Sequence, residues 1–185
     1  MFKPMRPELS IRPGRPGDAA NLAALAIQVF LHTYATQGIS SVLSAHALSE
    51  FTPEKFAASL GSETTQIFVA EEGAHLVGYA RIGFGAVCSE RSASTAELTT
   101  LYMQEHFTGQ GVGSALLAQA QALGWQRTGQ ALWLTVNAQN ARAIAFYATH
   151  GYSKLGTAWF ALGGERHENH VLVAPGRKDA VPMTR

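Results

Sequence analysis

Glycine recurs at alternate positions in the sequence Thr108-Gly109-Gln110-Gly111-Val112-Gly113. Glycine allows a positive φ angle and lets another molecule approach the backbone closely. A helix that begins directly after such a turn adds unpaired N–H groups and a partial positive charge. Together these features predict an anion cradle that suits a pyrophosphate. The alternative is a flexible loop whose glycines only make a tight strand-to-helix turn.

Two common nucleotide-binding motifs do not fit this turn. A dinucleotide fingerprint would need a third glycine at the position of Ser114, and an acid about 20 residues later, where residues 131–134 are apolar. No Walker lysine follows the turn either. A nucleotide-dependent oxidoreductase is therefore disfavoured, and we expect the turn to bind a phosphorylated ligand of another kind.

A second set of candidate residues begins with Asn137 and continues through Asn140 to Tyr147. Asn140 can cap a helix, and Tyr147 lies two turns later, within about 20° of the same helix face. One ligand could therefore meet both side chains. Tyr147 could also be an aromatic core residue that packs beside Ile144 and Phe146.

Hydrophobic spacing predicts the elements that position these residues. We expect helices at about 18–35, 53–61, 111–127 and 140–150. We expect strands at about 11–12, 66–71, 75–84, 95–103, 131–136, 152–162 and 168–173. Asp18 and Thr52 are the predicted caps of the first two helices, and Glu72-Gly73 is a predicted turn.

The order of these elements predicts an α+β fold. Three consecutive strands suggest an antiparallel meander, and the strand–helix–strand order that follows predicts a parallel pair. We expect a mixed, mostly antiparallel central sheet flanked by helices. A chain of 185 residues fits one domain, which we place at residues 9–174, with flexible tails at 1–8 and 175–185.

Composition excludes several classes of protein. A formal charge of +1, with no run of Lys and Arg, argues against a nucleic-acid partner. Cys88 is the only cysteine, which excludes an internal disulfide, and His167 and His170 cannot share a strand face, so no metal site is expected. The sequence has no signal peptide and no uncharged apolar stretch of about 18 residues, so we expect no membrane association and a cytoplasmic protein.

The sequences ELTTLYM at 97–103 and TGQGVGSALL at 108–117 resemble motif A of the GNAT superfamily of N-acetyltransferases. The resemblance implies that acetyl-CoA is the cosubstrate. It assigns the CoA pyrophosphate to the amides of Thr108, Gly109, Gln110, Gly111, Val112, Gly113 and Ser114. It assigns the pantetheine arm to the backbone of Leu101, Tyr102 and Met103. The family usually has Gln or Arg at the position of Thr108, which predicts a weaker phosphate contact here.

Residues 133–137 (WLTVN), Asn140, and residues 143–147 (AIAFY) resemble GNAT motif B. In the family the flanking parallel strands splay apart to admit CoA, and the asparagine contacts the pantetheine. By resemblance Asn137 and Asn140 are cofactor-binding residues, and Tyr147 is the general acid that faces the CoA sulfur. Glu97 occupies the strand position at which many members carry their base; the alternative is a solvent-facing strand acid, with water as the base.

The acceptor is less defined than the cosubstrate. The first helix often walls the acceptor pocket in the family, which makes His32 and Tyr34 candidate substrate-binding residues. The segments VFLHTY at 29–34 and WFALGG at 159–164 are similar to bacterial spermidine/spermine N-acetyltransferases. A polyamine, a protein N-terminal amine, an amino acid and an antibiotic amine remain open as acceptors, as does a homodimer. A non-catalytic acyl-CoA-binding regulatory module is the alternative function.

Overall fold

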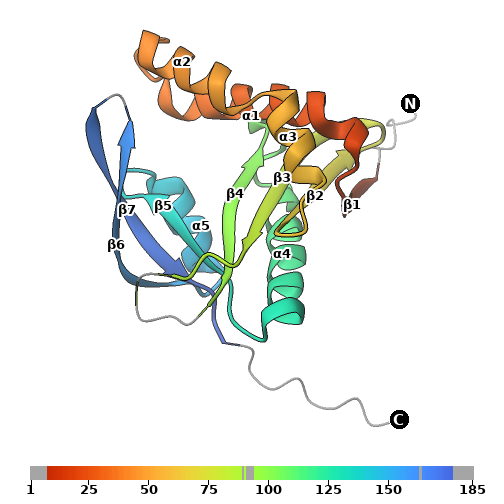
Figure 1. Cartoon of the computed structure of the whole chain (residues 1–185), viewed down its shortest axis with the longest axis vertical. Helices are drawn as coiled ribbons and strands as arrows, with labels where there is room; N and C mark the ends of the chain where they lie inside the picture. The colour runs from red at the N-terminus through yellow and green to blue at the C-terminus, as the bar shows by residue number, and fades with distance from the viewer. Residues whose placement is uncertain (1–7, 89, 91–93, 163, 177–185) are drawn as a thin grey trace, which may run out of the picture. The chain divides into compact units, whose positions relative to one another are not determined.

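The structure is a computed structural model that describes residues 8–88, 90, 94–162 and 164–176 (Figure 1). Its α-helices are α1 (Ala19–Tyr34), α2 (Ser41–Glu50), α3 (Pro53–Leu60), α4 (Val112–Thr128) and α5 (Ala141–Thr149). Its strands are β1 (Leu9–Pro13), β2 (Thr65–Glu72), β3 (His75–Phe84), β4 (Ala96–Met103), β5 (Trp133–Asn137), β6 (Ser153–Leu162) and β7 (Glu165–Val173). Short 3₁₀ helices η1 (Pro16–Asp18) and η2 (Glu105–Phe107) precede α1 and follow β4.

The strands are hydrogen-bonded in the order β1-β2-β3-β4-β5-β7-β6. The pairs β1–β2, β2–β3, β5–β7 and β6–β7 are antiparallel. Strands β4 and β5 are parallel, with Glu97 opposite Trp133. The predicted α+β fold with a mixed, mostly antiparallel sheet is therefore confirmed.

The chain forms two compact units, and each is built from separate segments. The first unit contains residues Met1–Gly83 and Thr99–Ala120, and the second contains Phe84–Leu98 and Gln121–Arg185. Strand β4 passes from one unit to the other after Leu98, and helix α4 does so after Ala120.

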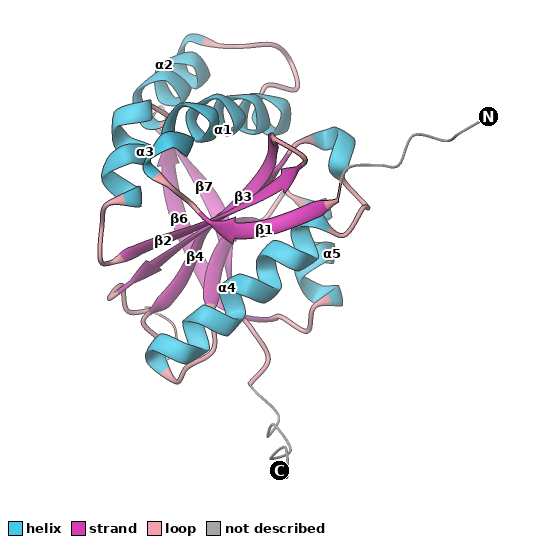
Figure 2. Cartoon of the chain, turned by 90° about the vertical axis from the view of Figure 1, so that its right-hand side faces the viewer, coloured by secondary structure: helices cyan, strands magenta, loops and turns pink. Residues whose placement is uncertain are grey.

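Helices α1 and α3 pack against strands β2 and β3 in the first unit. Helix α1 buries Leu22, Ala23, Leu25, Ala26 and Phe30, the spacing of one helix face. These side chains form a core with Phe56, Ile67, Val69 and Tyr79. Gly78, next to Tyr79 on β3, faces the opposite side and approaches Leu116 of α4. Strand β3 therefore has α1 and α3 on one side and α4 on the other (Figure 2).

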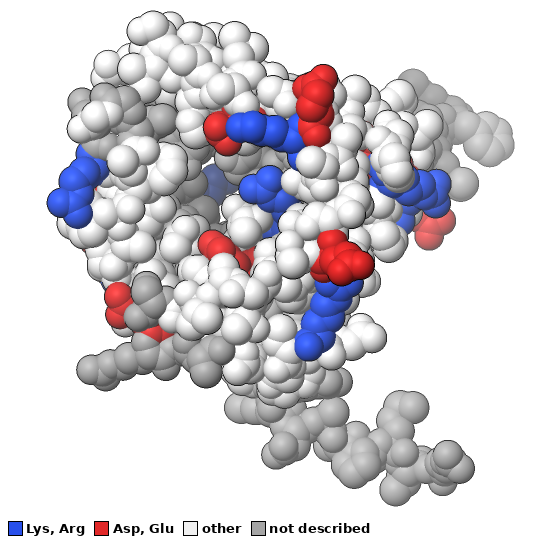
Figure 3. All heavy atoms as spheres, viewed as in Figure 1, with Lys and Arg blue, Asp and Glu red and all other residues white. Residues whose placement is uncertain are grey.

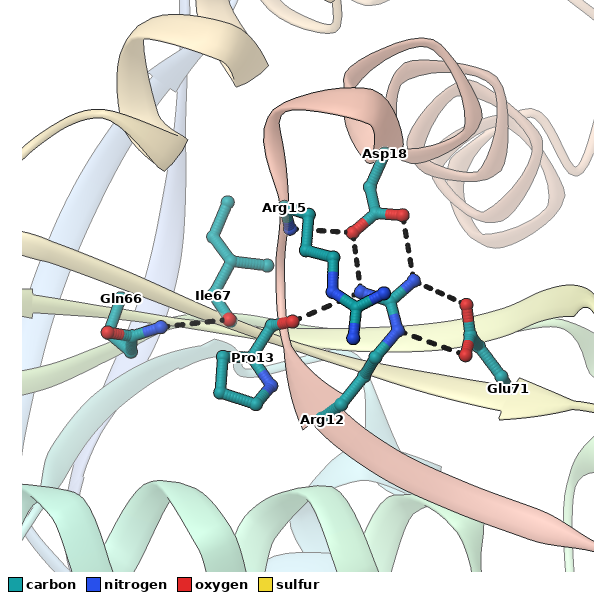
Figure 4. A network of polar contacts seen from close by, with 7 residues as sticks. All are labelled: Arg12, Pro13, Arg15, Asp18, Gln66, Ile67 and Glu71. Carbon is teal, nitrogen blue, oxygen red and sulfur yellow. Dashed lines mark hydrogen bonds and ion pairs between the residues drawn. The ribbon is translucent and has the colours of Figure 1, made fainter.

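An ionic network joins β1, β2 and the start of α1 (Figure 4). Arg12 donates to both carboxylate oxygens of Asp18, at 2.7 and 2.9 Å, and also bonds the carboxylate of Glu71. The bond with Arg12 is the main cause that lowers the pKa of Asp18. Asp18 precedes α1 but makes no side-chain cap bond to that helix. The predicted cap is therefore wrong: the carboxylate accepts from the amide of Arg15 and binds Arg12 instead.

Helix α2 was missed by the sequence prediction. The Ser40 hydroxyl caps it by accepting a bond from the amide of Leu43, at 3.3 Å. Only Ala47 is buried in this helix, so it has no apolar stripe from which the helical period could be read. The other predicted helices are present, and Thr52 caps α3 as expected.

The second unit contains β5, β6, β7 and helix α5. Trp133 and Val171 form a small core with Cys88. The hydroxyl of Tyr152 accepts a bond from the Gln121 amide at 3.2 Å, and burial raises the pKa of Tyr152 to about 12. Gly124 of α4 lies close to Leu132 and Ala96, because a Cβ there would be 3.2 and 3.5 Å from their side chains. These contacts hold the second half of α4 against the strands of this unit.

Candidate active site

The glycine turn lies between η2 and α4 in the first unit. Gly109 and Gly111 have φ angles of 74° and 86°, a region that side chains disfavour. A Cβ at either position would meet no atom within 4 Å. The glycines are therefore required by backbone conformation rather than by crowding, and the space beside them is open to a ligand.

The first turn of α4 follows the glycine turn directly. The amide of Ala115 makes the first helical hydrogen bond, to the carbonyl of Gly111 at 2.9 Å. The amides of Val112 and Gly113 precede that bond, so they have no acceptor within the helix. Thr108 and Gln110 instead donate their amides within the turn, to the carbonyls of Glu105 and Phe107. Val112 and Gly113 are buried, whereas Gly109, Gly111 and Ser114 are exposed, so the amides along the whole turn are the candidate anion donors.

Strand β4 carries the residues predicted to face the pantetheine, and its alternation of faces is interrupted. Thr99 bonds Arg81 of β3, and the ring of Tyr102 contacts that of Tyr79 at 5.8 Å between centroids. Arg81 and Tyr79 share one face of β3, so Thr99 and Tyr102 share a face although they are three residues apart. This irregularity, of the kind a β-bulge produces, changes the direction of the backbone groups near Leu101.

Met103 ends β4 on the opposite face from Tyr102. A Cβ at Gly78 would lie 2.9 Å from the Tyr102 carbonyl oxygen and 3.2 Å from the Met103 Cβ. Glycine at position 78 therefore lets β3 and β4 approach closely just before the glycine turn. The amide of Gln104 then bonds the carbonyl of Val77 at 2.9 Å, which fixes the end of the strand.

Asn137 and Asn140 lie at the two ends of the short loop between β5 and α5, in the second unit. The Asn137 side-chain oxygen accepts from the amide of Gln139 at 2.8 Å. The Asn140 oxygen accepts from the amide of Ala143 at 3.0 Å, which confirms Asn140 as the cap of α5. Because both oxygens are used locally, the NH₂ groups are the parts of these side chains able to contact a ligand.

Tyr147 is buried in the second unit, with 8% of its surface exposed. Its ring packs against Phe146 and Tyr152, each at 5.3 Å between centroids. Its carbonyl accepts bonds from the amides of His150 and Tyr152 at the end of α5. The ring is therefore anchored by packing, as the core interpretation requires, and this fixed position would also suit a catalytic hydroxyl.

Glu97 lies opposite Trp133 where β4 and β5 pair, also in the second unit. It is half-buried between the buried residues Ala96 and Leu98. The indole nitrogen of Trp133 is buried and, within the described part of the chain, has no hydrogen-bond partner. Sequence reasoning singled out Glu97, but a tryptophan in an apolar strand gave no signal of an unpaired donor.

His32 and Tyr34 lie in the last turn of α1, in the first unit. His32 is exposed, and its Nε2 lies 3.6 Å from a carboxylate oxygen of Glu105. The Tyr34 ring packs against Phe30 at 5.0 Å, although 40% of the residue is exposed. Burial of the hydroxyl raises the pKa of Tyr34. Tyr34 thus belongs to an aromatic row, whereas His32 points to the surface.

The candidate residues fall into two groups. The first unit holds residues 101–103, the turn at 108–114, His32 and Tyr34. The second unit holds Glu97, Asn137, Asn140 and Tyr147. Among the described residues, no group of three or more His, Cys, Asp or Glu side chains could hold a metal ion. No helix in the described ranges is long and apolar enough to cross a membrane.

The sequence model of the Acetyltransferase (GNAT) family matches residues 31–152, which include both groups. An uncharacterized N-acetyltransferase of Mycobacterium tuberculosis is 31% identical over 160 residues, covering 84% of this chain and 96% of the relative. The chain belongs to the GNAT acetyltransferase family.

Other GNAT proteins share the fold at lower identity. The PaiA N-acetyltransferase of Thermoplasma acidophilum, solved in complex with coenzyme A, matches with a TM-score of 0.69 and 20% identity. The match covers 88% of this chain and 98% of that protein. The ribosomal-protein-alanine N-acetyltransferase of Brucella melitensis matches with a TM-score of 0.66 and 21% identity, over 89% of this chain and 98% of its own. These similarities confirm the GNAT fold.

Proposed function

We propose that this protein transfers the acetyl group of acetyl-CoA to a primary amine, by direct attack of the amine within a ternary complex. The observation that carries the proposal is the glycine turn at the start of α4, in a chain of the GNAT family. The open space at Gly109 and Gly111, and the amides that precede the first full turn of α4, suit an approaching pyrophosphate. The residues present therefore fit CoA.

Strand β4 would hold the pantetheine arm through its backbone. Its irregularity between Thr99 and Tyr102 turns peptide groups away from the regular pattern of the sheet. A peptide-like ligand arm can pair with such groups as an added strand would. Leu101, Tyr102 and Met103 supply this backbone, and the NH₂ groups of Asn137 and Asn140 supply further donors.

Glu97 and Tyr147 would manage the protons. The attacking amine must lose a proton, which Glu97 accepts directly or through water. The amine nitrogen forms a bond to the thioester carbonyl carbon, and the bond from that carbon to sulfur breaks. Tyr147 then gives its hydroxyl proton to the departing thiolate. The anchored ring of Tyr147 keeps this hydroxyl in one position.

Binding is tested by thermal unfolding with acetyl-CoA. A ligand that binds only the native state adds about 2.7 kcal/mol at a concentration of 100 Kd, so acetyl-CoA should raise the melting temperature clearly. NAD and ATP should raise it much less. An unchanged melting temperature at millimolar acetyl-CoA would reject the proposed cosubstrate.

Turnover is tested with a panel of amines, by measuring the release of free CoA thiol. The panel should include a polyamine, a peptide with a free N-terminus, an amino acid and an aminoglycoside. Acetylation of at least one amine supports an enzyme. A large acetyl-CoA shift without any turnover would instead favour a non-catalytic acyl-CoA-binding module.

A further inference from the structure

Arg81 on β3 is a half-buried cation without an acidic partner. Among the described residues it forms no ion pair, and its side chain bonds only Thr99. A partly buried guanidinium loses hydration, which is costly unless a charged or polar group replaces the water. The position therefore suits an anionic group that arrives with a ligand.

Thr99 holds the guanidinium in one orientation. Arg81 Nε donates to the Thr99 hydroxyl at 3.0 Å, and that hydroxyl donates to the Arg81 carbonyl at 3.1 Å. This pair of bonds uses Nε and leaves the two Nη groups as donors. A guanidinium fixed in this way can bind a carboxylate through two parallel hydrogen bonds.

The charge of Arg81 contributes slightly to the lowered pKa of Glu50, but the Glu50 carboxylate already has an ion-pair partner. Its carboxylate accepts from Lys55 Nζ at 3.0 Å, and this bond is the main cause that lowers the pKa of Glu50. Acidic and basic side chains lie in small groups on the face shown in Figure 3. The ion pair of Glu50 is thus with Lys55 and not with Arg81.

Aromatic rings lie beside this cation on the same face of the first unit. Tyr79 contacts Tyr102, Tyr102 contacts Phe51, and Phe51 contacts Phe30, with centroids 5.8, 6.4 and 5.4 Å apart. Arg81 and Tyr79 are two residues apart on β3, so their side chains lie on the same face of the strand as this row of rings. A cation and an apolar surface thus occur together.

We propose that Arg81 binds a carboxylate on the acceptor, so that the substrate class is a primary amine that carries a carboxylate and an apolar or aromatic group. This inference rests on the proposed acetyl transfer. It disfavours a polyamine, because Arg81 would repel a second positive charge on the acceptor. Arg81 is a specificity-determining residue here, and it takes no part in the proton transfers.

The test compares acceptors that differ only in charge. One pair is para-aminomethylbenzoate and para-aminomethylbenzamide, and the other is phenylalanylglycine and its C-terminal amide. The protein should use the carboxylate of at least one pair with a kcat/KM about 10 to 100 times that of its amide, the usual strength of charge-assisted hydrogen bonds. The difference should lie mainly in KM.

Variants at Arg81 test whether this residue causes the preference for the carboxylate acceptor. Arg81→Met should remove the preference, by raising KM for the carboxylate much more than KM for the amide. Arg81→Lys should keep part of it, because the charge remains without the planar fork. Lys154→Gln removes an exposed positive charge on β6 and should leave kcat/KM unchanged for both the carboxylate and the amide. Each variant should keep its melting temperature shift with acetyl-CoA, which shows that it is folded.

Equal use of carboxylate and amide by the unmodified protein would overturn the inference, and so would a preference that persists in Arg81→Met. Acetylation of other amines with no use of either pair would also overturn it. All three outcomes leave acetyl transfer itself intact. Absence of both an acetyl-CoA shift and any turnover would instead reject the proposed function.

Discussion

The glycine turn and helix α5 present their candidate groups in different ways. In the turn, the groups proposed to face a ligand are backbone amides, and Gly109 and Gly111 carry no side chains. In α5, they are the side chains of Asn140 and Tyr147, which also cap the helix and fill the core. A site made of backbone amides can be altered only by changing the conformation or the space around it. A site made of side chains can be altered by replacing a single functional group.

This difference decides whether a substitution can change ligand binding or chemistry without also changing the stability of the fold. In the turn, any side chain that blocks the ligand also strains the backbone, because Gly111 has a positive φ angle. In α5, removal of one hydroxyl or exchange of one amide group can leave packing and capping intact. The second unit therefore permits cleaner tests of chemistry, and the first needs matched controls for strain.

Gly111→Glu should have the largest effect. It places bulk and negative charge in the open space beside the α4 amides, so acetyl-CoA binding should be lost, with a Kd raised beyond about 100-fold by charge repulsion and blocked contacts. Isothermal titration measures the affinity. Gly129→Glu is the control, because Gly129 also has a positive φ angle and open space, at the other end of α4. Equal affinity in both variants would show that the turn is only structural.

Tyr147→Phe should have the next largest effect, confined to chemistry. The ring and its contacts remain, while kcat should fall by roughly 10² to 10⁴ if the hydroxyl is the general acid. Acetyl-CoA affinity should hardly change. Tyr152→Phe is a matched control that loses a buried hydroxyl bonded to Gln121, so it should lose stability without a comparable loss of kcat. Normal turnover in Tyr147→Phe would return Tyr147 to a purely structural role.

Arg12→Met tests whether the polar side chains of the first unit are structural. It leaves Asp18 and Glu71 without their cation, which should cost about 3 kcal/mol in chemical denaturation. The pKa of Asp18 is lowered in the folded state, so its contribution is present above the ordinary value of 3.8 and lost as the pH falls through the folded pKa. The difference in free energy of unfolding between the unmodified protein and Arg12→Met should therefore become smaller below about pH 4. A constant gap from pH 7 to pH 2 would exclude the ionic cause.

Substitutions of Asn140 should have the smallest effect. They can separate its role as the cap of α5 from its proposed contact with acetyl-CoA. Asn140→Ala should cost about 1 kcal/mol of stability because α5 loses its cap. Asn140→Asp keeps an oxygen for the cap but loses the NH₂ group. Stability should then be retained while the Kd for acetyl-CoA rises. If Asn140→Asp binds acetyl-CoA normally, the side chain is only a cap.

The regular elements were predictable where burial follows a period. Helices α1 and α4 bury residues at helical spacing, β2 and β3 contain short apolar runs, and the structure places all four within a few residues of the predicted bounds. Helix α2 has no such pattern, and it lacks the Thr-Pro start and glycine end from which α3 was predicted, although α3 also buries a single residue. Strand β1 was predicted as two residues but spans Leu9–Pro13, because its backbone pairing with β2 at the edge of the sheet extends beyond the short segment recognised in the sequence.

The candidate site was predictable where a residue type points to one backbone conformation. Glycines at alternate positions predict a special backbone, and the structure has positive φ angles at Gly109 and Gly111. Asp18 was wrongly taken as a cap, because its partner Arg12 lies in a different element that local sequence does not relate to it. Arg81 gave no signal either, since an arginine in a strand shows its lack of an acidic partner only after folding.

The division of β4 and α4 between the two units has a consequence for inheritance. Neither unit is a continuous stretch of the gene, because the chain changes unit after Gly83, Leu98 and Ala120. A single recombination event therefore cannot exchange one unit and leave the other complete. A crossover after Ala120 would exchange α5 together with the second half of α4, but it would leave residues 84–98 of the second unit behind.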